Sequence, residues 1–343
     1  MSEGKLPQEP LVSVVTPVYN AELYLAECIE SVLGQTYANY EYIIVNNCST
    51  DRTLEIAQSY AKKDKRIRVV DCDVFVNHIE NHNRALQLIS DKSKYCKIVQ
   101  ADDSIFPECL SKMVALAETK PSIGIVSSYC ILGTRISNYG LSFPISIISG
   151  RETCRLHLID GISLFGSPTA LLFCSDIVRK RTPFFPERSY HPDTEACYEI
   201  LQYSDFGFVH QILTFSRINN DSISSDRLPF NPNLLSAFIS VLKYGNVYLE
   251  KDEYARCYIG VKDRYFKFVG REYLRNRDRT FWTYHRKGLE NIGYSLRKSE
   301  LIKYALLFVL DCAFSPNATI SLAVERLKRA RHNRWQIRRA IEA

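Results

Sequence analysis

The fold is decided by the stretch LVSVVTPVYN, residues 11–20. Most of its residues are apolar and several are β-branched, which predicts a strand buried on both faces of a sheet. Apolar residues then recur at helical spacing, so a helix is predicted over 21–33, with Asn20 as its cap and Gly34 at its end. A buried strand that leads directly into an amphipathic helix is the beginning of a βαβ unit.

The same alternation of strands and helices continues outward from this unit. Further strands are predicted at 42–45, 67–70, 96–99, 123–128, 170–174 and 211–217, with helices at 52–62, at 81–90 and after Pro107. Because such units join parallel strands through right-handed crossovers, the pattern predicts an α/β fold, a mostly parallel sheet flanked by helices. After Asn231 the pattern becomes helical.

Polar clusters follow three of the predicted strands. They are TPVYN at 16–20, NNCSTD at 46–51 and the pair Asp102 and Asp103. Since ligands of open α/β sheets bind beyond the carboxyl ends of the strands, these clusters predict one shared site. The sequence contains neither GxGxxG nor GxxxxGK[ST], which excludes the dinucleotide fingerprint and the Walker A loop.

Asp102 and Asp103 are the strongest candidates for chemistry. Two adjacent carboxylates at a strand end are costly unless a cation lies beside them. Mg²⁺ and Mn²⁺ bind such oxygens together with substrate phosphates, and they neutralise the charge on a departing diphosphate. The alternative is a solvated turn, in which aspartates are common.

The chain resembles the family 2 glycosyltransferases in four motifs, which occur in the family's order: TPVYN, SVLGQT (31–36), YEYIIVNNCSTD (40–51) and QADD (100–103). The resemblance covers residues 10–225, about two thirds of the chain. It implies the Rossmann-like GT-A fold and an inverting transfer from a nucleotide sugar, with Mn²⁺ or Mg²⁺ as cofactor. Asn47 and Gln100 stand where the family usually has aspartates.

The resemblance also implies roles for individual residues of the nucleotide site. Pro17 and Tyr19 would line the nucleobase pocket, with the Tyr19 ring stacked on the base. Asn47 would contact the base edge, Asp102 would lie near the ribose and the metal, and Asp103 would be the principal metal ligand. The plainer alternatives are a core aromatic residue for Tyr19 and a turn former for Asn47.

Transfer to a hydroxyl group needs a base that takes its proton. The family places an acidic residue at a helix start well after the metal motif, and here HPDTEACY offers Asp193 and Glu195. Asp193 is slightly favoured because it is placed to cap the helix, although either acid can simply stabilise a helix start. Gly166 and Ser167 resemble a loop that borders the donor and acceptor sugars, and Arg217 resembles a residue that closes over the phosphates.

The predicted domain organisation follows from these motifs. A tail over 1–10 precedes a GT-A domain over 11–228, whose nucleotide-binding half is expected at 11–130 and acceptor half at 131–228. A helical region over 229–343 completes the chain.

The net charge of +6 is unevenly distributed. Residues 255–343 contain 20 Lys and Arg against 8 Asp and Glu, whereas residues 1–254 contain 24 against 30. Within 320–341, apolar residues recur at helical spacing among seven Lys and Arg, which predicts a basic amphipathic helix on anionic lipid. The alternative is a solvated or oligomer-forming helix. Nucleic acid is not expected as a partner, because no recognised reader motif accompanies the charge.

The cysteines and the termini bear on location. The 11 cysteines occur without a CxxC pair, which favours reduced core thiols over a zinc site. No apolar signal region begins the chain, and no stretch reaches the roughly 20 apolar residues of a membrane span. We therefore expect a cytoplasmic chain that lies peripherally on the inner face of the plasma membrane.

Together these features predict a glycosyltransferase of bacterial surface polysaccharide or glycolipid assembly. Its expected donor is a nucleotide sugar, most simply UDP-linked, and its acceptor a carbohydrate or a lipid-linked glycan. One rival is a sugar-phosphate nucleotidyltransferase, whose glycine-rich basic phosphate loop is missing here. The other is a non-catalytic sugar-binding or scaffolding relative, which the departures in NNCS and QADD allow.

Overall fold

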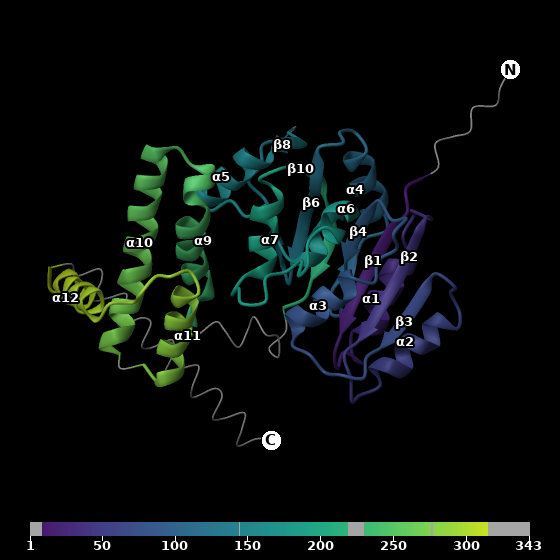
Figure 1. Cartoon of the computed structure of the whole chain (residues 1–343), viewed down its shortest axis with the longest axis horizontal. Helices are drawn as coiled ribbons and strands as arrows, with labels where there is room; N and C mark the ends of the chain where they lie inside the picture. Colours follow the sequence, from purple (N-terminus) through teal and green to yellow (C-terminus); the bar gives the residue numbers. More distant parts are fainter. Residues whose placement is uncertain (1–8, 144, 219–229, 276, 315–343) are drawn as a thin grey trace. The chain divides into compact units, whose positions relative to one another are not determined.

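The computed structural model describes residues 9–143, 145–218, 230–275 and 277–314 (Figure 1). By their contacts the residues divide into two units, Met1–Pro232 with Ser240–Cys257, and Asn233–Ile239 with Tyr258–Ala343. The helices α9 (Pro232–Tyr248) and α10 (Lys251–Leu274) each contribute to both units. The first unit contains the sheet and the second is helical.

The first unit is built on one sheet with the strand order β3-β2-β1-β4-β9-β6-β10-β5. Its strands are β1 (Val12–Val18), β2 (Tyr40–Asn46), β3 (Ile67–Asp71), β4 (Tyr95–Ile98), β5 (Ser104–Ile105), β6 (Ile123–Leu132), β7 (Arg135–Ser137), β8 (Ile147–Ser149), β9 (Leu172–Cys174) and β10 (Asp205–Ser216). Strands β3, β2, β1 and β4 are parallel neighbours, as are β6 and β10, whereas the short strands β5, β7, β8 and β9 pair in antiparallel fashion.

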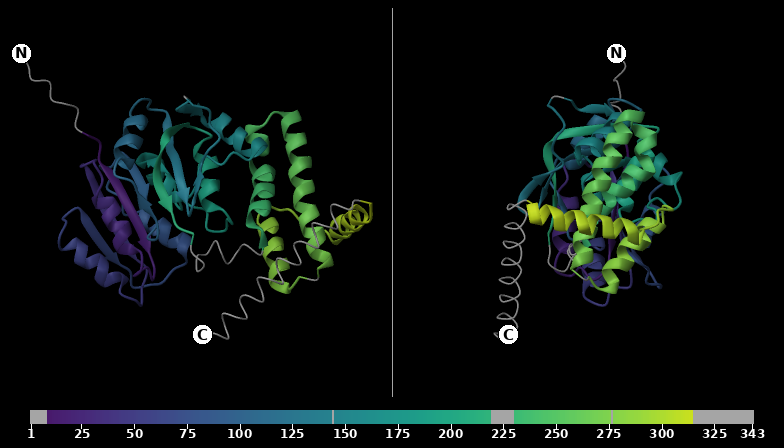
Figure 2. Two further views of the ribbon diagram at one scale, coloured as in Figure 1. Left: turned by 180° about the vertical axis from the view of Figure 1, so that it is seen from behind. Right: turned by 90° about the vertical axis from the view of Figure 1, so that its left-hand side faces the viewer.

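Helices flank this sheet, as Figure 2 shows from behind. They are α1 (Leu25–Leu33), α2 (Thr53–Ala61), α3 (His78–Leu86), α4 (Cys109–Ala117), α5 (Gly150–Asp160), α6 (Ser175–Arg179) and α7 (Pro192–Ile200), with the 3₁₀ turn η1 (Pro168–Ala170). The predicted α/β fold is therefore confirmed. Strands β5, β7 and β8 were not predicted. Each has only two or three residues, which is too short to show a periodicity, and their pairing depends on residues far away in the sequence.

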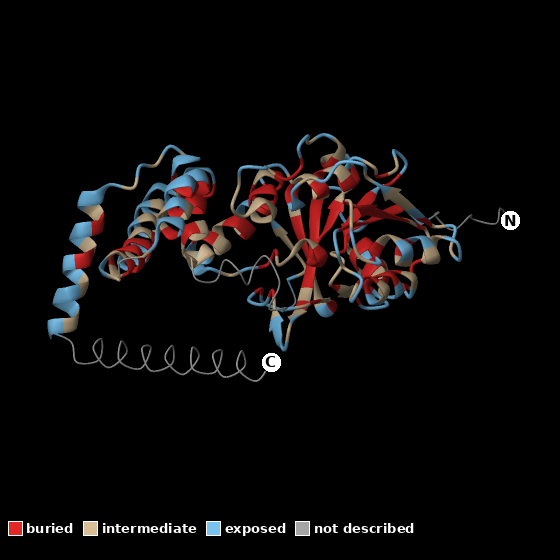
Figure 3. Ribbon diagram, turned by 90° about the horizontal axis from the view of Figure 1, so that it is seen from below, coloured by how far each residue is buried: buried red, intermediate tan, exposed pale blue. Residues whose placement is uncertain are grey.

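The core lies on both faces of the first strands. All seven residues of β1 are buried, and Figure 3 shows the central strands as the most buried part of this unit. Val12, Val14 and Val18 pack with Cys28 and Ile29 of α1. This burial explains why LVSVVTPV forms a strand whose residues are apolar on both faces instead of alternating with polar ones.

Two predicted helix starts are wrong. Helix α1 begins at Leu25 behind Tyr24, while Asn20 has the left-handed φ of 46° and its side-chain oxygen accepts the Thr50 backbone N–H at 2.8 Å. Asn20 therefore joins two loops and caps no helix. Helix α3 begins three residues earlier than predicted, because Asn77 forms a capping box with Glu80.

The second unit is an aromatic helical cluster. It contains α11 (Arg279–Glu290), α12 (Lys298–Phe314) and the end of α10, which agrees with the predicted helical region. Phe238 stacks on Tyr265, whose hydroxyl lies 3.0 Å from Nδ1 of His285. None of the helices in the described ranges is both long and apolar enough to cross a membrane. The predicted basic helix within 320–341 lies outside the described residues.

Candidate active site

Three chain segments meet at the carboxylate of Asp103, which follows strand β4. Its Oδ2 accepts a hydrogen bond from the Ser216 hydroxyl at 3.0 Å, and its Oδ1 accepts the backbone N–H of Arg217 at 3.1 Å. The Thr169 hydroxyl provides a further hydrogen bond. Since Ser216 ends β10 and Thr169 lies in η1, the acid is held by segments 66 or more positions away, and only 5% of the residue is exposed.

The Arg217 side chain lies beside the same aspartates and contacts the Asp102 backbone, Glu27 and the Tyr24 ring. Its Nε donates to the backbone oxygen of Asp102 at 3.2 Å, and its terminal nitrogen forms an ion pair with Glu27 at 2.8 Å. Its guanidinium also lies over the Tyr24 ring, 4.9 Å from the centroid. The side chain is therefore held at the acidic edge without forming an ion pair with either aspartate.

The surroundings of both carboxylates disfavour their ionised forms. Burial raises the pKa of Asp103 to about 6, and the neighbouring Asp102 charge adds to this effect. Burial also raises the pKa of Asp102. Across the described residues, no salt bridge joins either acid to a cationic side chain, and the nearby Arg217 charge, which lowers the pKa of Asp102, does not outweigh its burial.

This charge pattern fits a divalent cation that takes only part of its ligands from the protein. Nowhere in the described ranges do three or more His, Cys, Asp or Glu gather as a complete metal site. Mg²⁺ characteristically binds through one or two carboxylates and completes its shell with waters and substrate phosphates. Asp102 and Asp103 suit that role, because a cation beside them would favour the ionised forms that burial disfavours.

Two exposed aromatic rings lie at the carboxyl edge of the parallel strands. Tyr19, directly after β1, is 48% exposed, and Phe75, after β3, is 57% exposed. Their ring centroids are 4.9 Å apart in an edge-to-face arrangement. Phe75 was missed by the sequence analysis, although a large aromatic residue in a polar loop after a strand was a usable signal. Pro17, by contrast, is buried within β1.

Both polar groups of the Asn47 side chain form hydrogen bonds within the protein. Asn47 is 2% exposed, its Nδ2 donates to the Val76 backbone oxygen at 2.7 Å, and its Oδ1 accepts the Val76 N–H at 3.0 Å. Both functions of the amide are thus used to hold the loop that carries Phe75. In this arrangement the side chain of Asn47 holds Val76 and has no free polar group for a ligand.

The structure distinguishes the two candidate bases on α7. Glu195 is buried, and its carboxylate accepts the Ser189 hydroxyl at 2.6 Å and the Lys243 ammonium at 2.5 Å. Asp193 is partly exposed and accepts the Thr194 backbone N–H at 2.9 Å. It lies in the first turn, whereas His191 occupies the N-cap position, so the expectation that Asp193 caps the helix is wrong.

The loop with Gly166 and Ser167 is tied to the acidic edge. The Ser167 hydroxyl lies 2.9 Å from that of Ser216, which in turn donates to Asp103. Gly166 has a φ of +69°, and a Cβ there would lie 2.4 Å from the Asn138 side chain. Hydrogen bonds therefore link the predicted residues Asp102, Asp103, Ser167 and Arg217 to one another at one place.

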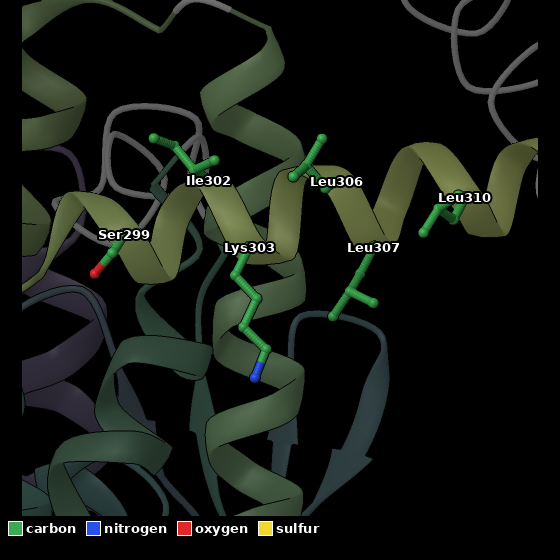
Figure 4. Close-up of a pocket in the computed structure, with 6 residues that line it drawn as sticks. All are labelled: Ser299, Ile302, Lys303, Leu306, Leu307 and Leu310. Atoms are coloured by element: carbon green, nitrogen blue, oxygen red, sulfur yellow. The ribbon is translucent and has the colours of Figure 1, made fainter.

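The helical unit has an apolar surface of its own. A shallow depression of about 520 Å³ on α12 is lined by Ser299, Ile302, Lys303, Leu306, Leu307 and Leu310, whose side chains project from the helix in Figure 4. Its three leucines and Ile302 are exposed, which is unusual for four large apolar side chains close together on one helix. Its lining residues include no carboxylate, so the depression offers no carboxylate ligand for a divalent cation.

Sequence comparison identifies the first unit's family. Residues 13–180 match the family model described as Glycosyl transferase family 2. An uncharacterized glycosyltransferase of Haemophilus influenzae is 38% identical over 120 residues, 35% of this chain and 36% of that protein. A putative teichuronic acid biosynthesis glycosyltransferase, TuaG of Bacillus subtilis, is 39% identical over 106 residues, 31% of this chain and 41% of that protein. These alignments thus span well under two thirds of the relatives' lengths.

Structural comparison supports the fold. The structure of Staphylococcus aureus TarS 1-349 in complex with UDP-GlcNAc has a TM-score of 0.59 and 17% identity, over 82% of this chain and 80% of that one. The mannosyltransferase PcManGT of Pyrobaculum calidifontis, in complex with GDP-Man and Mn²⁺, has a TM-score of 0.54 and 15% identity, over 88% and 87%. The predicted GT-A fold is confirmed. The segment 13–180, just under half of the chain, matches the family 2 glycosyltransferases.

Proposed function

We propose that the chain transfers a sugar from a UDP-linked donor to a hydroxyl acceptor, with inversion at the anomeric carbon. The observation that carries this proposal is the pair of carboxylates after β4, of which Asp103 is buried and Asp102 partly buried, and neither of which forms a salt bridge in the described part of the chain. In a family 2 glycosyltransferase, a diphosphate with its cation is the charge-complementary ligand for such a pair.

In the proposed reaction, Asp193 takes the proton of the acceptor hydroxyl. The hydroxyl oxygen forms a bond with the anomeric carbon as the bond to the diphosphate oxygen breaks, and the nucleoside diphosphate leaves. Mg²⁺ or Mn²⁺ held by Asp103 and Asp102 would neutralise the charge that develops on the leaving group. Tyr19 and Phe75 hold the base, and Arg217 adds positive charge beside the phosphates.

Glu195 has a supporting part in this scheme. Its ion pair with Lys243 and its hydrogen bond from Ser189 hold the start of α7, so that Asp193, two residues earlier, keeps its place. The proposed nucleotide-binding half, 11–130, contains the aromatic pair and the aspartates. The proposed acceptor half, 131–228, contains Asp193, Gly166 and Ser167.

Relatives support the donor, metal and setting. TarS is described with UDP-GlcNAc, PcManGT with GDP-Man and Mn²⁺, and TuaG as a teichuronic acid biosynthesis protein. By analogy we assign this chain to bacterial surface polysaccharide or glycolipid assembly, with a carbohydrate or lipid-linked acceptor. Its peripheral location on the inner membrane face is part of the proposal, supported by the exposed leucines of α12 and the basic residues within 320–341.

The test is a thermal-shift panel of UDP-, GDP- and dTDP-sugars with and without Mn²⁺, followed by product analysis. A metal-dependent shift with a UDP-sugar, together with release of UDP when acceptor is added, is the expected result. Release of pyrophosphate from nucleoside triphosphate and sugar phosphate would instead identify a nucleotidyltransferase. Nucleotide-sugar binding without transfer to any acceptor extract would contradict the enzymatic proposal and favour a binding protein.

A further inference from the structure

Lys97 is a fully buried lysine in the centre of the sheet. It lies in β4, opposite Val14 of β1 and Leu172 of β9, with 0% of the residue exposed. Neither its burial nor its contacts belong to the roles described above. Burial lowers the pKa of its ammonium group, as expected for a cation removed from water.

The ammonium group has an unusual set of partners. Its Nζ donates to the backbone oxygen of Thr169 at 2.5 Å and lies 3.6 Å from the Met113 sulfur. Within the described ranges, no carboxylate lies at ion-pair distance from it. The charge of Asp103 favours the ammonium form, but burial outweighs it. A cation buried in this way is destabilising, so stability alone does not explain a lysine here.

Thr169 connects this lysine to the acidic edge. Its hydroxyl accepts the Gln100 backbone N–H at 3.1 Å and hydrogen-bonds the Asp103 carboxylate. Lys97 lies six positions before Asp103 in the chain and is therefore linked to this acid through Thr169, a residue far away in the sequence. Without a bond to the Thr169 oxygen, η1 would be held against β4 by fewer polar contacts.

We propose that Lys97 is a positioning residue for the proposed donor site. By binding the Thr169 oxygen, it places the Thr169 hydroxyl against Asp103 and orients that carboxylate toward the cation and diphosphate. The inference rests on the proposed function, because it assigns a role in holding the metal-binding acid. It predicts that the lysine is retained for the geometry of the site, at a cost in stability.

The decisive variant is Lys97→Met, which keeps the length of the side chain and removes its charge and donors. The melting temperature without ligand is expected to stay unchanged or rise, because a buried cation is replaced by an apolar group. The Mn²⁺ concentration that gives half of the UDP-induced thermal shift is expected to rise about tenfold, as for the loss of one orienting hydrogen bond. Lys112→Met, at an exposed lysine of α4, is the matched control.

A second pair of variants tests the same link without altering the buried lysine. Thr169→Val removes the hydroxyl and is expected to weaken Mn²⁺-dependent UDP binding similarly, whereas Thr169→Ser keeps it and is expected to bind like the unaltered protein. The double variant Lys97→Met with Thr169→Val is expected to show the same Mn²⁺-dependent UDP binding as the single variant that binds less tightly. The two substitutions do not add, because both act through one contact.

Two results would overturn the inference. One is a folded Lys97→Met protein whose Mn²⁺ half-saturation lies within twofold of the unaltered protein. The other is Thr169→Val binding equal to that of Thr169→Ser. Failure of the unaltered protein to bind any nucleotide with Mn²⁺ would instead contradict the proposed function, which keeps the two failures distinguishable.

Discussion

At the scale of single residues, Asp103 shows how burial and charge define the site. Its carboxylate accepts hydrogen bonds from Ser216, Arg217 and Thr169, yet burial still raises its pKa to about 6. The hydrogen bonds that favour the ionised form are therefore outweighed by the loss of water. In the proposed function, a cation supplied with the substrate would reverse this balance and would couple donor binding to the protonation state of this acid.

This balance predicts a pH dependence of stability in EDTA. The folded protein holds a proton on Asp103 up to pH about 6, whereas an ordinary aspartate releases it near 3.8. The folded state therefore binds more protons in between, and the free energy of unfolding falls as pH rises from about 4 to about 6, by at most about 3 kcal/mol. Asp103→Asn is expected to lack this fall in urea unfolding and to lose Mn²⁺-dependent UDP binding. Parallel pH profiles for the two proteins would contradict the assignment, with exposed Asp73→Asn as control.

Phe75 provides the second prediction at residue scale. Because its exposed ring contacts Tyr19 edge to face, we expect it to form a second wall of the proposed base site. Phe75→Ala is expected to weaken UDP binding about tenfold, within the range of base–aromatic stacking. Isothermal titration calorimetry measures this, and Val74→Ala, at the exposed neighbouring position, is expected to bind UDP normally. Equal affinities of both variants would remove Phe75 from the site.

At the scale of elements, α7 shows two acids with different tasks. Glu195 is locked by Lys243 of α9 and by Ser189, whereas Asp193 keeps its carboxylate partly exposed in the first helical turn. An acid that must accept a proton needs access to its substrate, and an acid that secures a helix start needs partners. The first turn of α7 therefore contains one acid that is held by partners and one that stays accessible for the proposed proton transfer.

The two acids can be separated by substitution. Asp193→Asn is expected to lower kcat about 10²-fold or more while UDP-sugar binding and stability remain, because only proton transfer is lost. Glu195→Gln is expected to lower the free energy of unfolding by about 1 to 2 kcal/mol through its weakened bonds to Lys243 and Ser189. Single-turnover kinetics and urea unfolding test both. If Glu195→Gln abolishes turnover at full stability while Asp193→Asn turns over normally, the roles are reversed.

The loop before η1 gives a second prediction for an element. Gly166 combines a left-handed φ of +69° with a Cβ position that meets the Asn138 side chain at 2.4 Å. Gly161 has a similar φ of +66° but has nothing within 4 Å of its Cβ position. Gly161→Ala is expected to cost about 1 kcal/mol from backbone strain, and Gly166→Ala clearly more, with loss of activity through Ser167. Similar unfolding free energies of the two variants would show that the Asn138 contact is unimportant.

At the scale of the whole molecule, acidic and basic residues are unevenly distributed along the sequence. The acidic first three quarters contain the aspartates that need a cation, and the basic last quarter contains the exposed apolar face of α12. Apolar and cationic groups together suit an anionic lipid surface better than either group alone.

Removal of residues 315–343 is expected to weaken co-sedimentation with anionic vesicles and leave UDP-sugar binding unchanged. The double substitution Leu306→Glu with Leu310→Glu is expected to weaken it as well, because it places charge on the exposed face of α12. Tyr203→Glu, at an exposed aromatic residue of the first unit, is the control for nonspecific adhesion. Binding that is unaffected by both changes would remove the membrane from the proposal.

Local patterns made much of the fold predictable. The βαβ units, the order of the four motifs and the position of the aspartate pair after β4 follow from residue spacing, since strands and helices have distinct periods. The errors lie at loops and boundaries. Asn20 was assigned to a cap because its residue type is common there, but its amide satisfies the backbone of Thr50, 30 positions away.

By itself, the sequence determined the family, the α/β class and the acidic edge, because these depend on residues close together in the chain. Only the tertiary structure decided which side chains remain available. The Asn47 amide is hydrogen-bonded to Val76, 29 positions away, and the Glu195 carboxylate to Lys243, 48 positions away. The Thr169 backbone oxygen accepts a hydrogen bond from Lys97, 72 positions away. Such pairings form only when folding has closed the intervening loops, so residue type and spacing along the chain do not determine them.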